Sequence, residues 1–253
     1  MIYLMGFRLK DEISNADKQS FPLSINALKN FKEFRFKKPV TFFIGENGCG
    51  KSTIVESIAD YLGIPADGGT KDFQFYFKEN DKNELRTDDG DNDVQFAHHD
   101  RSELSKYLVF AKGATKFKNA FFFRAESFYN LAQTNLVRRY STSLLQESHG
   151  ESFIDFLENT FDENSLYILD EPEAALSPRN QMKVLRLIDR LSKRGTQFII
   201  STHSPILLSY RDGDIYSLDN GFENIEFEKS NIYILYKRFI NDYEKFQEMI
   251  LDD

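Results

Sequence analysis

The chain has 253 residues, and its 40 acidic side chains outnumber its 32 basic ones, which gives a formal net charge of −8. Hydrophobic residues make up 41% and charged residues 28%, a composition that is ordinary for a globular protein and excludes disorder over the whole length. The single cysteine excludes an internal disulfide and a multi-cysteine zinc site. No run approaches the roughly 20 apolar residues that span a bilayer, and the N-terminus lacks a signal peptide's apolar run, so we expect a cytoplasmic protein.

The first part of the chain predicts strands at residues 1–10 and 34–36, and a buried strand at residues 40–44. The third strand leads directly into Gly45-Glu46-Asn47-Gly48-Cys49-Gly50-Lys51-Ser52-Thr53, and apolar residues at helical spacing follow. This is the Walker A pattern in its usual strand–loop–helix context.

The Walker A run predicts a nucleotide site. Its glycines let backbone N–H groups turn inward around phosphate oxygens, and the helix N-terminus adds positive charge. Lys51 would reach the β- and γ-phosphates, and the Ser52 hydroxyl would ligate Mg²⁺. Cys49 is either a thiol made reactive by the helix N-terminus or a small residue that fits the loop, which we favour. The expected nucleotide-binding residues are Gly45, Asn47, Gly48, Cys49, Gly50, Lys51, Ser52 and Thr53.

Residues 67–107 are expected to form an acidic inserted lobe. Residues 67–103 carry 5 basic and 11 acidic side chains, a net of −6 out of the total of −8. The aspartate cluster at residues 88–93 suggests a calcium loop, but its glycine is misplaced for an EF-hand and no glutamate holds the twelfth position. We favour a solvent-exposed acidic turn.

A second motif follows an apolar strand at residues 166–169. The strand ends in Asp170-Glu171-Pro172-Glu173, a Walker B pattern. Asp170 would hold the magnesium, directly or through water, and Glu171 would act as the general base for the attacking water.

Two further segments stand out after the Walker B run. A buried strand at residues 198–200 leads to His203, which would hold the γ-phosphate or orient the water. A lone histidine at a strand end is usually structural, but its place after both Walker motifs favours function. Residues 231–251 are expected to form one C-terminal helix whose apolar stripe packs on the body or on a second copy.

Four short runs give the chain a family resemblance. The run Ser148-His149-Gly150-Glu151 resembles the ABC signature, and residues 170–177 resemble Walker B plus the D-loop, although Ser177 stands where many members have Asp. Ser201-Thr202-His203 resembles the H-loop, and residues 30–34 (Asn-Phe-Lys-Glu-Phe) resemble the run ahead of the P-loop in RecF-like proteins. Together they resemble the ABC-class ATPases of the SMC/RecF-like, predicted AAA-family type.

The resemblance implies a fold, cofactors and a mechanism. The fold would be an α/β P-loop NTPase with ABC ATPase head architecture over residues 1–253: a mixed central sheet, a helical signature lobe at 128–160 and a small antiparallel β lobe. Two copies would sandwich two ATP molecules with Mg²⁺, and Ser148, His149, Gly150 and Glu151 of one copy would cap the γ-phosphate held by the other.

The resemblance leaves three residues with open alternatives. Lys32 would lie near the phosphates. Glu126 stands near the place of the family's glutamine and would reach the magnesium, or else it pairs with a neighbouring base. Ser148 and Glu151 also have capping-box spacing, so this run could be only a helix cap.

Three functions compete. The first is an ATP-dimerised ATPase that remodels nucleic acid or a separate effector protein; 50 residues follow His203, too few for an attached nuclease domain. The second is an ABC transporter subunit, which the acidic helix after the signature disfavours. The third is a slow ATP-dependent clamp. The basic residues that could line a nucleic-acid groove, or form a solvated face, are Lys112, Lys116, Lys118, Arg138 and Arg139.

Overall fold

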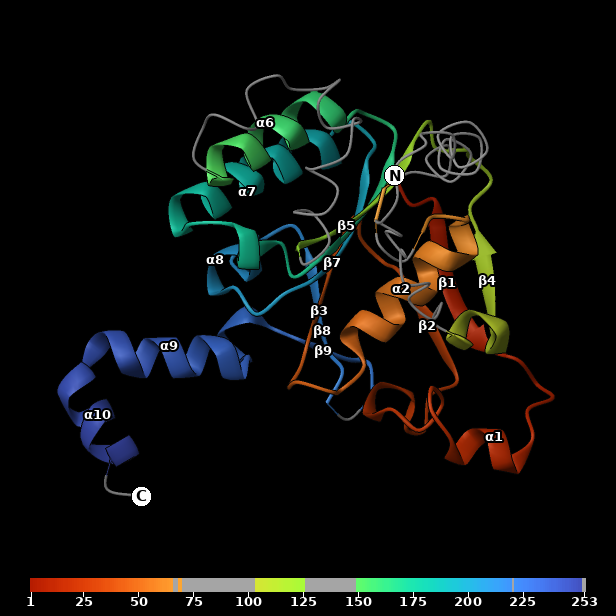
Figure 1. The fold of residues 1–253 in the computed structure, drawn as a ribbon, viewed down its shortest axis with the longest axis horizontal. Coiled ribbons are helices and arrows are strands. Elements are labelled where there is room, and N and C mark those ends of the chain that lie inside the picture. The colour runs from red at the N-terminus through yellow and green to blue at the C-terminus, as the bar shows by residue number, and fades with distance from the viewer. Residues whose placement is uncertain (66–67, 70–102, 126–148, 220, 252–253) are drawn as a thin grey trace, which may run out of the picture.

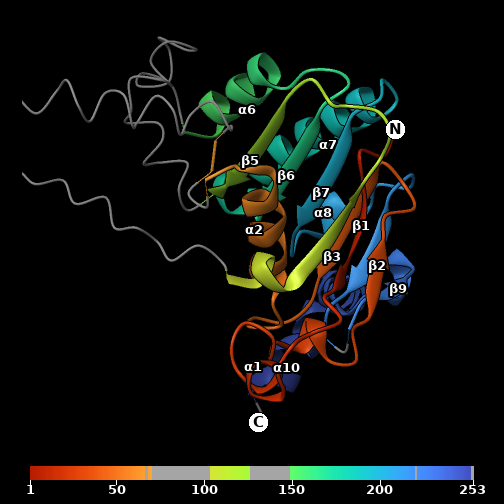
Figure 2. The same cartoon turned by 90° about the vertical axis from the view of Figure 1, so that its right-hand side faces the viewer.

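The computed structural model describes residues 1–65, 68–69, 103–125, 149–219 and 221–251, with the side chains of 149–153 excepted. Most of the expected acidic lobe lies outside the described residues, and so do Glu126, Arg138, Arg139 and Ser148. Two sheets and the helices that cover them make up most of the described residues (Figures 1 and 2).

The larger sheet has six strands in the order β5-β6-β7-β3-β8-β9. Every neighbouring pair from β5 to β8 is parallel, and only β8 with β9 is antiparallel, so the sheet is mixed. The strands span Val40–Ile44 (β3), Ala120–Arg124 (β5), Leu166–Asp170 (β6), Gln197–Ser201 (β7), Asp214–Ser217 (β8) and Glu223–Ile225 (β9).

Both faces of the sheet are buried at β5, β6, β7 and β3, which explains why these strands are mostly apolar runs. Successive side chains point to opposite faces, so Phe42 joins one core cluster while Phe43 joins the other. The same alternation separates Phe121 and Phe123 from Phe122. The many phenylalanines of the sequence therefore fill two cores, one on each side of the sheet.

Three helices cover one face and pack through the first cluster (Figure 1). The helix α7 shows why they form there: Ser177 accepts a hydrogen bond from the backbone N–H of Asn180, and proline follows at the first helical position. Its buried residues recur at helical spacing on one side. The helices are α6 (His149–Thr160), α7 (Pro178–Ser192) and α8 (Pro205–Leu208).

The other face is covered by α2 (Lys51–Leu62) and, beyond it, by a three-stranded antiparallel sheet in the order β2-β1-β4. Ile54, Val55 and Ile58 of α2 are fully buried between the two sheets. The short helix α1 (Asn15–Gln19) precedes β2 and buries no residue. The strands are β1 (Leu4–Leu9), β2 (Glu33–Arg35) and β4 (Leu108–Lys112).

One buried amide joins the two sheets. The side chain of Gln197, at the start of β7, accepts hydrogen bonds from the backbone N–H groups of Tyr3 (2.7 Å) and Leu4 (3.0 Å). It also donates to the carbonyl oxygen of Leu4 at 3.1 Å. All of its side-chain polar atoms thereby find partners on the first strand, as a buried amide requires.

The C-terminal segment departs from the expected single helix. It forms two helices, α9 (Asn231–Asn241) and α10 (Tyr243–Leu251), because Asp242 between them leaves helical conformation at φ −155° and ψ 79°. The side chain of Asp242 then caps α10 by accepting a hydrogen bond from the backbone N–H of Lys245 at 3.1 Å. Of the two expected partners of its apolar stripe, the body contacts the start of α9 at Ile232, and neither helix has a buried residue.

The mixed sheet, its flanking helices and the small antiparallel sheet confirm the predicted α/β P-loop NTPase fold. The strand–loop–helix unit that defines it is β3, the glycine-rich loop and α2.

Candidate nucleotide-binding site

The predicted site residues come from three neighbouring strands. β7 lies between β3 and β6, and all three run parallel, so their carboxyl ends meet at one edge of the sheet. Asp170 lies opposite Ser201 across the β6–β7 pair, and Ser201 lies opposite Phe43, two residues before the P-loop begins. The sheet order thus brings together segments that are more than 100 residues apart in sequence.

The loop between β3 and α2 requires glycine at two points. Gly50 caps α2 at φ 110°, and a Cβ there would lie 2.6 Å from Ile25. Gly45 has φ 149°, and a Cβ there would lie 2.6 Å from the Cys49 sulfur. Both positions combine a backbone conformation that favours glycine with close neighbours. The loop ends at the N-terminus of α2, where free N–H groups favour an anion.

Lys51 lies in this loop with only 5% of its surface exposed. Its ammonium group donates to the carbonyl oxygens of Gly45 (2.8 Å) and Glu46 (3.3 Å). The ammonium charge therefore lies at the loop, where phosphate oxygens can replace those carbonyl oxygens as its hydrogen-bond acceptors.

Sequence reasoning missed Asp219, which braces the P-loop from the end of β8. Its Oδ1 accepts a hydrogen bond from the backbone N–H of Glu46 at 2.7 Å. Ser217 holds the other carboxylate oxygen by donating at 3.1 Å. An acidic residue just beyond a strand of the same sheet was the available signal, but nothing in the sequence tied it to the loop.

Ser52 and Asp170 form the candidate magnesium site. The Ser52 hydroxyl lies 3.4 Å from Asp170 Oδ1, and Asp170 is 3% exposed. Burial raises the pKa of Asp170, against the opposing effects of a hydrogen bond from Ser201 and the charge of Arg124. A hydroxyl and a carboxylate converging on one point suit Mg²⁺, which prefers hard oxygen ligands. The buried carboxylate is also the kind of group that a cation would stabilise.

Arg124 is a second residue that sequence reasoning missed. It ends β5 opposite Asp170, its Nη1 lies 2.6 Å from Glu56 Oε1 of α2, and its Nε lies 3.9 Å from Asp170 Oδ2. The guanidinium therefore links the helix that follows the P-loop to the metal-site carboxylate. A basic residue at the end of a buried strand was the available signal.

Glu171 and His203 face each other beside this pair. Glu171 Oε1 lies 3.6 Å from His203 Nε2, and the side chains are 42% and 38% exposed. Glu171 has φ 47°, a left-handed conformation that is costly for a glutamate and is typical of functional sites. Burial, and next the charge of Lys51, lower the pKa of His203, so the imidazole is neutral at pH 7. Among the described residues its Nε2 has no hydrogen-bond partner.

Glu173 is the third missed residue. Its Oε1 accepts a hydrogen bond from the backbone N–H of His203, 30 residues further along the chain. Burial raises the pKa of Glu173, although that hydrogen bond opposes the shift. The glutamate thus fixes the loop that carries His203 to the loop that carries Glu171.

The remaining predicted residues fall in several places. Cys49 is 2% exposed, and burial raises the pKa of its thiol despite the charge of Lys51, so the structure favours a small packed residue over a reactive thiol. Lys32 is exposed ahead of β2, and its carbonyl oxygen accepts a hydrogen bond from the backbone N–H of Leu9. His149, Gly150 and Glu151 lie within the first turn of α6, whereas we expected that helix to start near Ser152.

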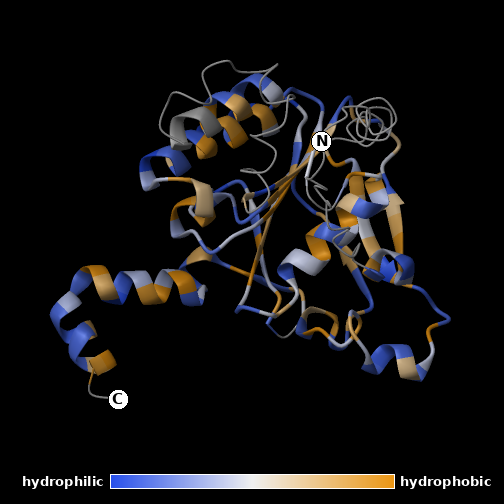
Figure 3. Ribbon diagram, viewed as in Figure 1, coloured by the Kyte–Doolittle hydropathy of each residue, from blue (hydrophilic) through white to orange (hydrophobic). Residues whose placement is uncertain are grey.

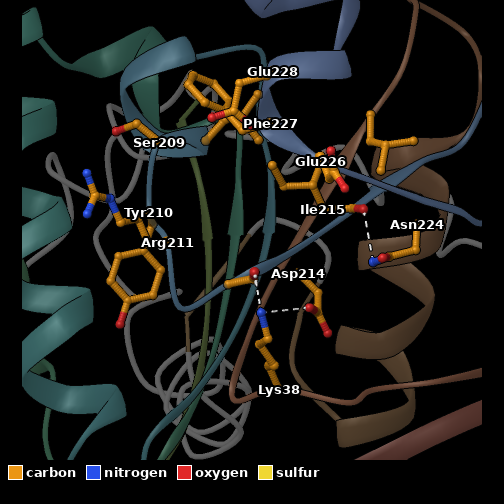
Figure 4. Close-up of a pocket in the computed structure, with 13 residues that line it drawn as sticks. Lys38, Ser209, Tyr210, Arg211, Asp214, Ile215, Asn224, Glu226, Phe227 and Glu228 are labelled. Atoms are coloured by element: carbon orange, nitrogen blue, oxygen red, sulfur yellow. Dashed lines mark hydrogen bonds and ion pairs between the residues drawn. The ribbon is translucent and has the colours of Figure 1, made fainter.

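Two pockets lie outside this cluster. One, of about 490 Å³, is lined by residues after α8 and by β8, β9 and the turn that follows (Figure 4). There Lys38 pairs with Asp214 at 3.0 Å and donates to the carbonyl oxygen of Gly213, so its charge is already neutralised (Figure 4). The other lies on the N-terminal segment and includes Ile25, which packs against the P-loop glycine Gly50.

Comparisons with solved structures return an ATP-binding cassette and an SMC head domain. A nucleotide-free ATP-binding cassette from an ABC transporter is 14% identical, with a TM-score of 0.44 and coverage of 89% of this chain and 90% of that one. The SMC head domain from Thermotoga maritima is 17% identical, with a TM-score of 0.42 and coverage of 89% and 100%.

A family model matches the part of the chain that carries the second half of the site. Residues 139–209 match the family model described as "AAA domain, putative AbiEii toxin, Type IV TA system". An "Uncharacterized ABC transporter ATP-binding protein" of Haemophilus influenzae is 36% identical over 70 residues, 28% of this chain and 27% of that one. A relative in Methanothermobacter marburgensis, described as an ABC transporter ATP-binding protein, is 39% identical over 56 residues, 22% of this chain and 20% of that one.

The chain spans about a quarter of the length of the curated relatives it matches. The matched segment contains the Walker B and H-loop runs, and with the P-loop it confirms the resemblance to ABC-class ATPases. The fold is that of an α/β P-loop NTPase. In the described part of the chain, every helix is too short or too polar to cross a membrane.

Proposed function

We propose that the protein is an Mg²⁺-dependent ATP hydrolase that dimerises around two ATP molecules. The observation that carries this proposal is the convergence of Lys51, the Ser52–Asp170 pair and the Glu171–His203 pair at one sheet edge. A phosphate-binding loop, a metal-binding pair and a base facing a neutral imidazole are the parts that ATP hydrolysis needs.

Each side chain has a role that its geometry supports. The P-loop N–H groups and Lys51 hold the phosphates, and Ser52 and Asp170 hold Mg²⁺, which stabilises the charge that develops on the phosphate oxygens. Glu171 accepts the proton of the attacking water. The imidazole of His203, neutral because of its lowered pKa, offers a hydrogen bond to the water or to the γ-phosphate.

The exposure of the base supports dimerisation. Glu171 and His203 remain more than a third exposed in one copy, although hydrolysis is favoured where bulk water is excluded. A second copy that places Ser148, His149, Gly150 and Glu151 over the γ-phosphate would close the site. ATP would then bind the dimer together, hydrolysis would release it, and the cycle would drive remodelling of nucleic acid or of a partner effector.

The experiment compares the wild-type chain with Glu171→Gln, which keeps the size of the side chain and removes the base. Wild type should release phosphate with Mg·ATP, and the rate of the variant should be lower by at least about 100-fold. The variant should also have a much lower dimer dissociation constant with Mg·ATP than without nucleotide. Glu223→Gln, an exposed residue of β9, is the matched control and should behave as wild type. Undiminished phosphate release by Glu171→Gln contradicts the proposal.

A transporter subunit is the second candidate, and the names of the matched relatives favour it. A transporter subunit would co-purify with an integral membrane protein from detergent-solubilised membranes, and its turnover would depend on that partner. Full turnover by the purified chain alone, or stimulation by DNA that falls as salt rises, favours the first candidate. Nucleotide-dependent dimerisation with almost no phosphate release would instead indicate a slow clamp.

A further inference from the structure

The C-terminal helices α9 and α10 form an arm that extends from the body (Figure 1). Neither helix has a buried residue, yet apolar residues recur along both of them (Figure 3). Ile240 is 73% exposed and Leu251 is 75% exposed. The other large apolar residues that are more than a third exposed in the arm are Ile234, Leu235, Tyr236, Phe239, Tyr243, Met249 and Ile250.

The apolar stripe of the arm begins on the body and continues into solvent. Ile232, in the first turn of α9, packs against the core cluster that also holds α8. Leu235, Phe239 and Tyr243 follow at helical spacing but have no core to join. At the elbow the Phe239 and Phe246 rings pack on each other at 5.7 Å, so the stripe turns the corner from α9 to α10 without interruption.

The area involved is large for a free surface. The nine exposed apolar side chains offer on the order of 1,000 Å², whereas the largest apolar patch of a monomer is about 300–600 Å². A stable interface buries about 800 Å² on each partner. The arm therefore carries enough apolar surface for one standard interface.

The charges of the arm indicate which partner fits. The only charged residues of α9 are Lys237 and Arg238, a net charge of +2. From Asp242 to Leu251 the chain carries Asp242, Glu244, Glu248 and Lys245, three acids and one base, a net charge of −2. One half of the arm is thus complementary to the other half. A two-fold interface can place one element of each chain against a different element of the second copy, which suits this partition.

We propose that the arm is a dimerisation element that pairs with the arm of a second copy, α9 of each chain against α10 of the other. The pairing buries both apolar stripes and places each basic pair beside the acidic half of its partner. It needs no nucleotide, and so differs from the ATP-dependent closure proposed above. The arm would keep two nucleotide sites in one particle between rounds of hydrolysis.

The test measures the solution mass of the full chain by sedimentation, in EDTA and without nucleotide, at about 50 μM, a concentration at which micromolar pairing is nearly complete. The wild-type chain should sediment at twice 29.5 kDa. Ile240→Asp, which places a charge in the stripe at its more exposed side, should raise the dimer dissociation constant by about 100-fold. A wild-type monomer overturns the proposal, whatever other partner the arm might meet.

Charge reversal tests the pairing of α9 with α10. The double variant Lys237→Glu with Arg238→Glu should weaken the dimer by about ten-fold or more, because like charges then face each other. Glu244→Lys with Glu248→Lys should do the same. The four changes combined should restore the dimer, since the complementarity is then reversed on both sides. Arg186→Glu with Arg190→Glu, the same change of charge on exposed positions of α7, is the control and should leave the mass unchanged.

If the variant with all four changes does not regain the dimer, the α9–α10 pairing is wrong. It is also wrong if the dimer persists in every arm variant. These outcomes are separate from the proposed catalytic function. Arm variants that are monomeric without nucleotide should still release phosphate from Mg·ATP, and Glu171→Gln should still dimerise through its arm in EDTA.

Discussion

The carboxylate of Glu173 accepts a hydrogen bond from the backbone N–H of His203. Glu173 lies two residues after the proposed base, in the turn that follows β6, and His203 lies in the turn that follows β7. A half-buried side chain therefore links the two turns across which Glu171 and His203 lie 3.6 Å apart.

The first prediction concerns this link. Glu173→Ala should lower kcat for ATP hydrolysis by about ten-fold or more while leaving KM within about two-fold, because it loosens the His203 turn without touching the P-loop. Glu173→Gln keeps an acceptor oxygen and should retain most of the activity. Steady-state kinetics on both variants test this. Equal losses in the two variants would show that the carboxylate charge, and not the hydrogen bond, is what matters.

The second prediction concerns Asp170. Burial raises its folded-state pKa above the unfolded value, so the folded state holds a proton more tightly and unfolding free energy falls as pH rises through that window. Asp170→Asn can still accept the hydrogen bond from Ser201. It should therefore raise the melting temperature at pH 7 without Mg²⁺, and remove part of this pH dependence.

The same Asp170→Asn variant should lose the stabilisation that Mg·ATP gives the wild type and should release little phosphate. Thermal unfolding across about pH 4–8, a range that starts at the ordinary aspartate pKa of about 3.9, provides the measurement with and without Mg·ATP. A melting temperature below that of wild type at pH 7 without Mg²⁺ would contradict the cost assigned to the buried charge.

The third prediction concerns pH and His203. Because burial and Lys51 lower the pKa of this imidazole, the midpoint of its protonation should lie below the ordinary histidine pKa of about 6.5. If neutral His203 is the active form, kcat is flat from neutral pH upward and falls on the acid side. In His203→Gln, kcat should be lower at every pH. The fall of kcat at low pH that protonation of His203 causes should disappear. A rate–pH profile for both proteins checks this; an unchanged acid limb in the variant assigns that limb to another group.

The fourth prediction concerns the amide that joins the sheets. Gln197→Leu leaves the backbone N–H groups of Tyr3 and Leu4 buried without their acceptor. The expected loss in unfolding free energy is about 2–4 kcal/mol, the cost of two unsatisfied buried donors. Urea unfolding measures it, with exposed Gln19→Leu as the control. A loss below about 1 kcal/mol would mean that Tyr3 and Leu4 find other partners or water.

Contiguous residues made much of the site predictable. The P-loop is a continuous run whose glycines, lysine and serine lie within a few residues of one another, so the sequence predicted its local structure. Asp170, Glu171 and His203 each follow an apolar strand directly, and parallel strands place their carboxyl ends together. The structure brings these predicted residues to one sheet edge as expected.

The residues that brace the site could not be found in this way. Asp219 reaches Glu46 across 173 residues of sequence, and Gln197 reaches Leu4 across 193. Arg124 meets Asp170 because β5 and β6 are neighbours in the sheet. Such contacts depend on strand order and register, which no local pattern of residues specifies.

The C-terminal arm shows the same division. Its helical period could be predicted from the sequence, because 3.6-residue spacing is a local property. The break at Asp242 and the absence of a core beneath the stripe could not be predicted in this way. Local sequence determined the phosphate loop, the strand-end acids and the amphipathic helices. Only the tertiary structure decided which distant groups hold them in place and which apolar face is left exposed, because burial and pairing depend on the path of the whole chain.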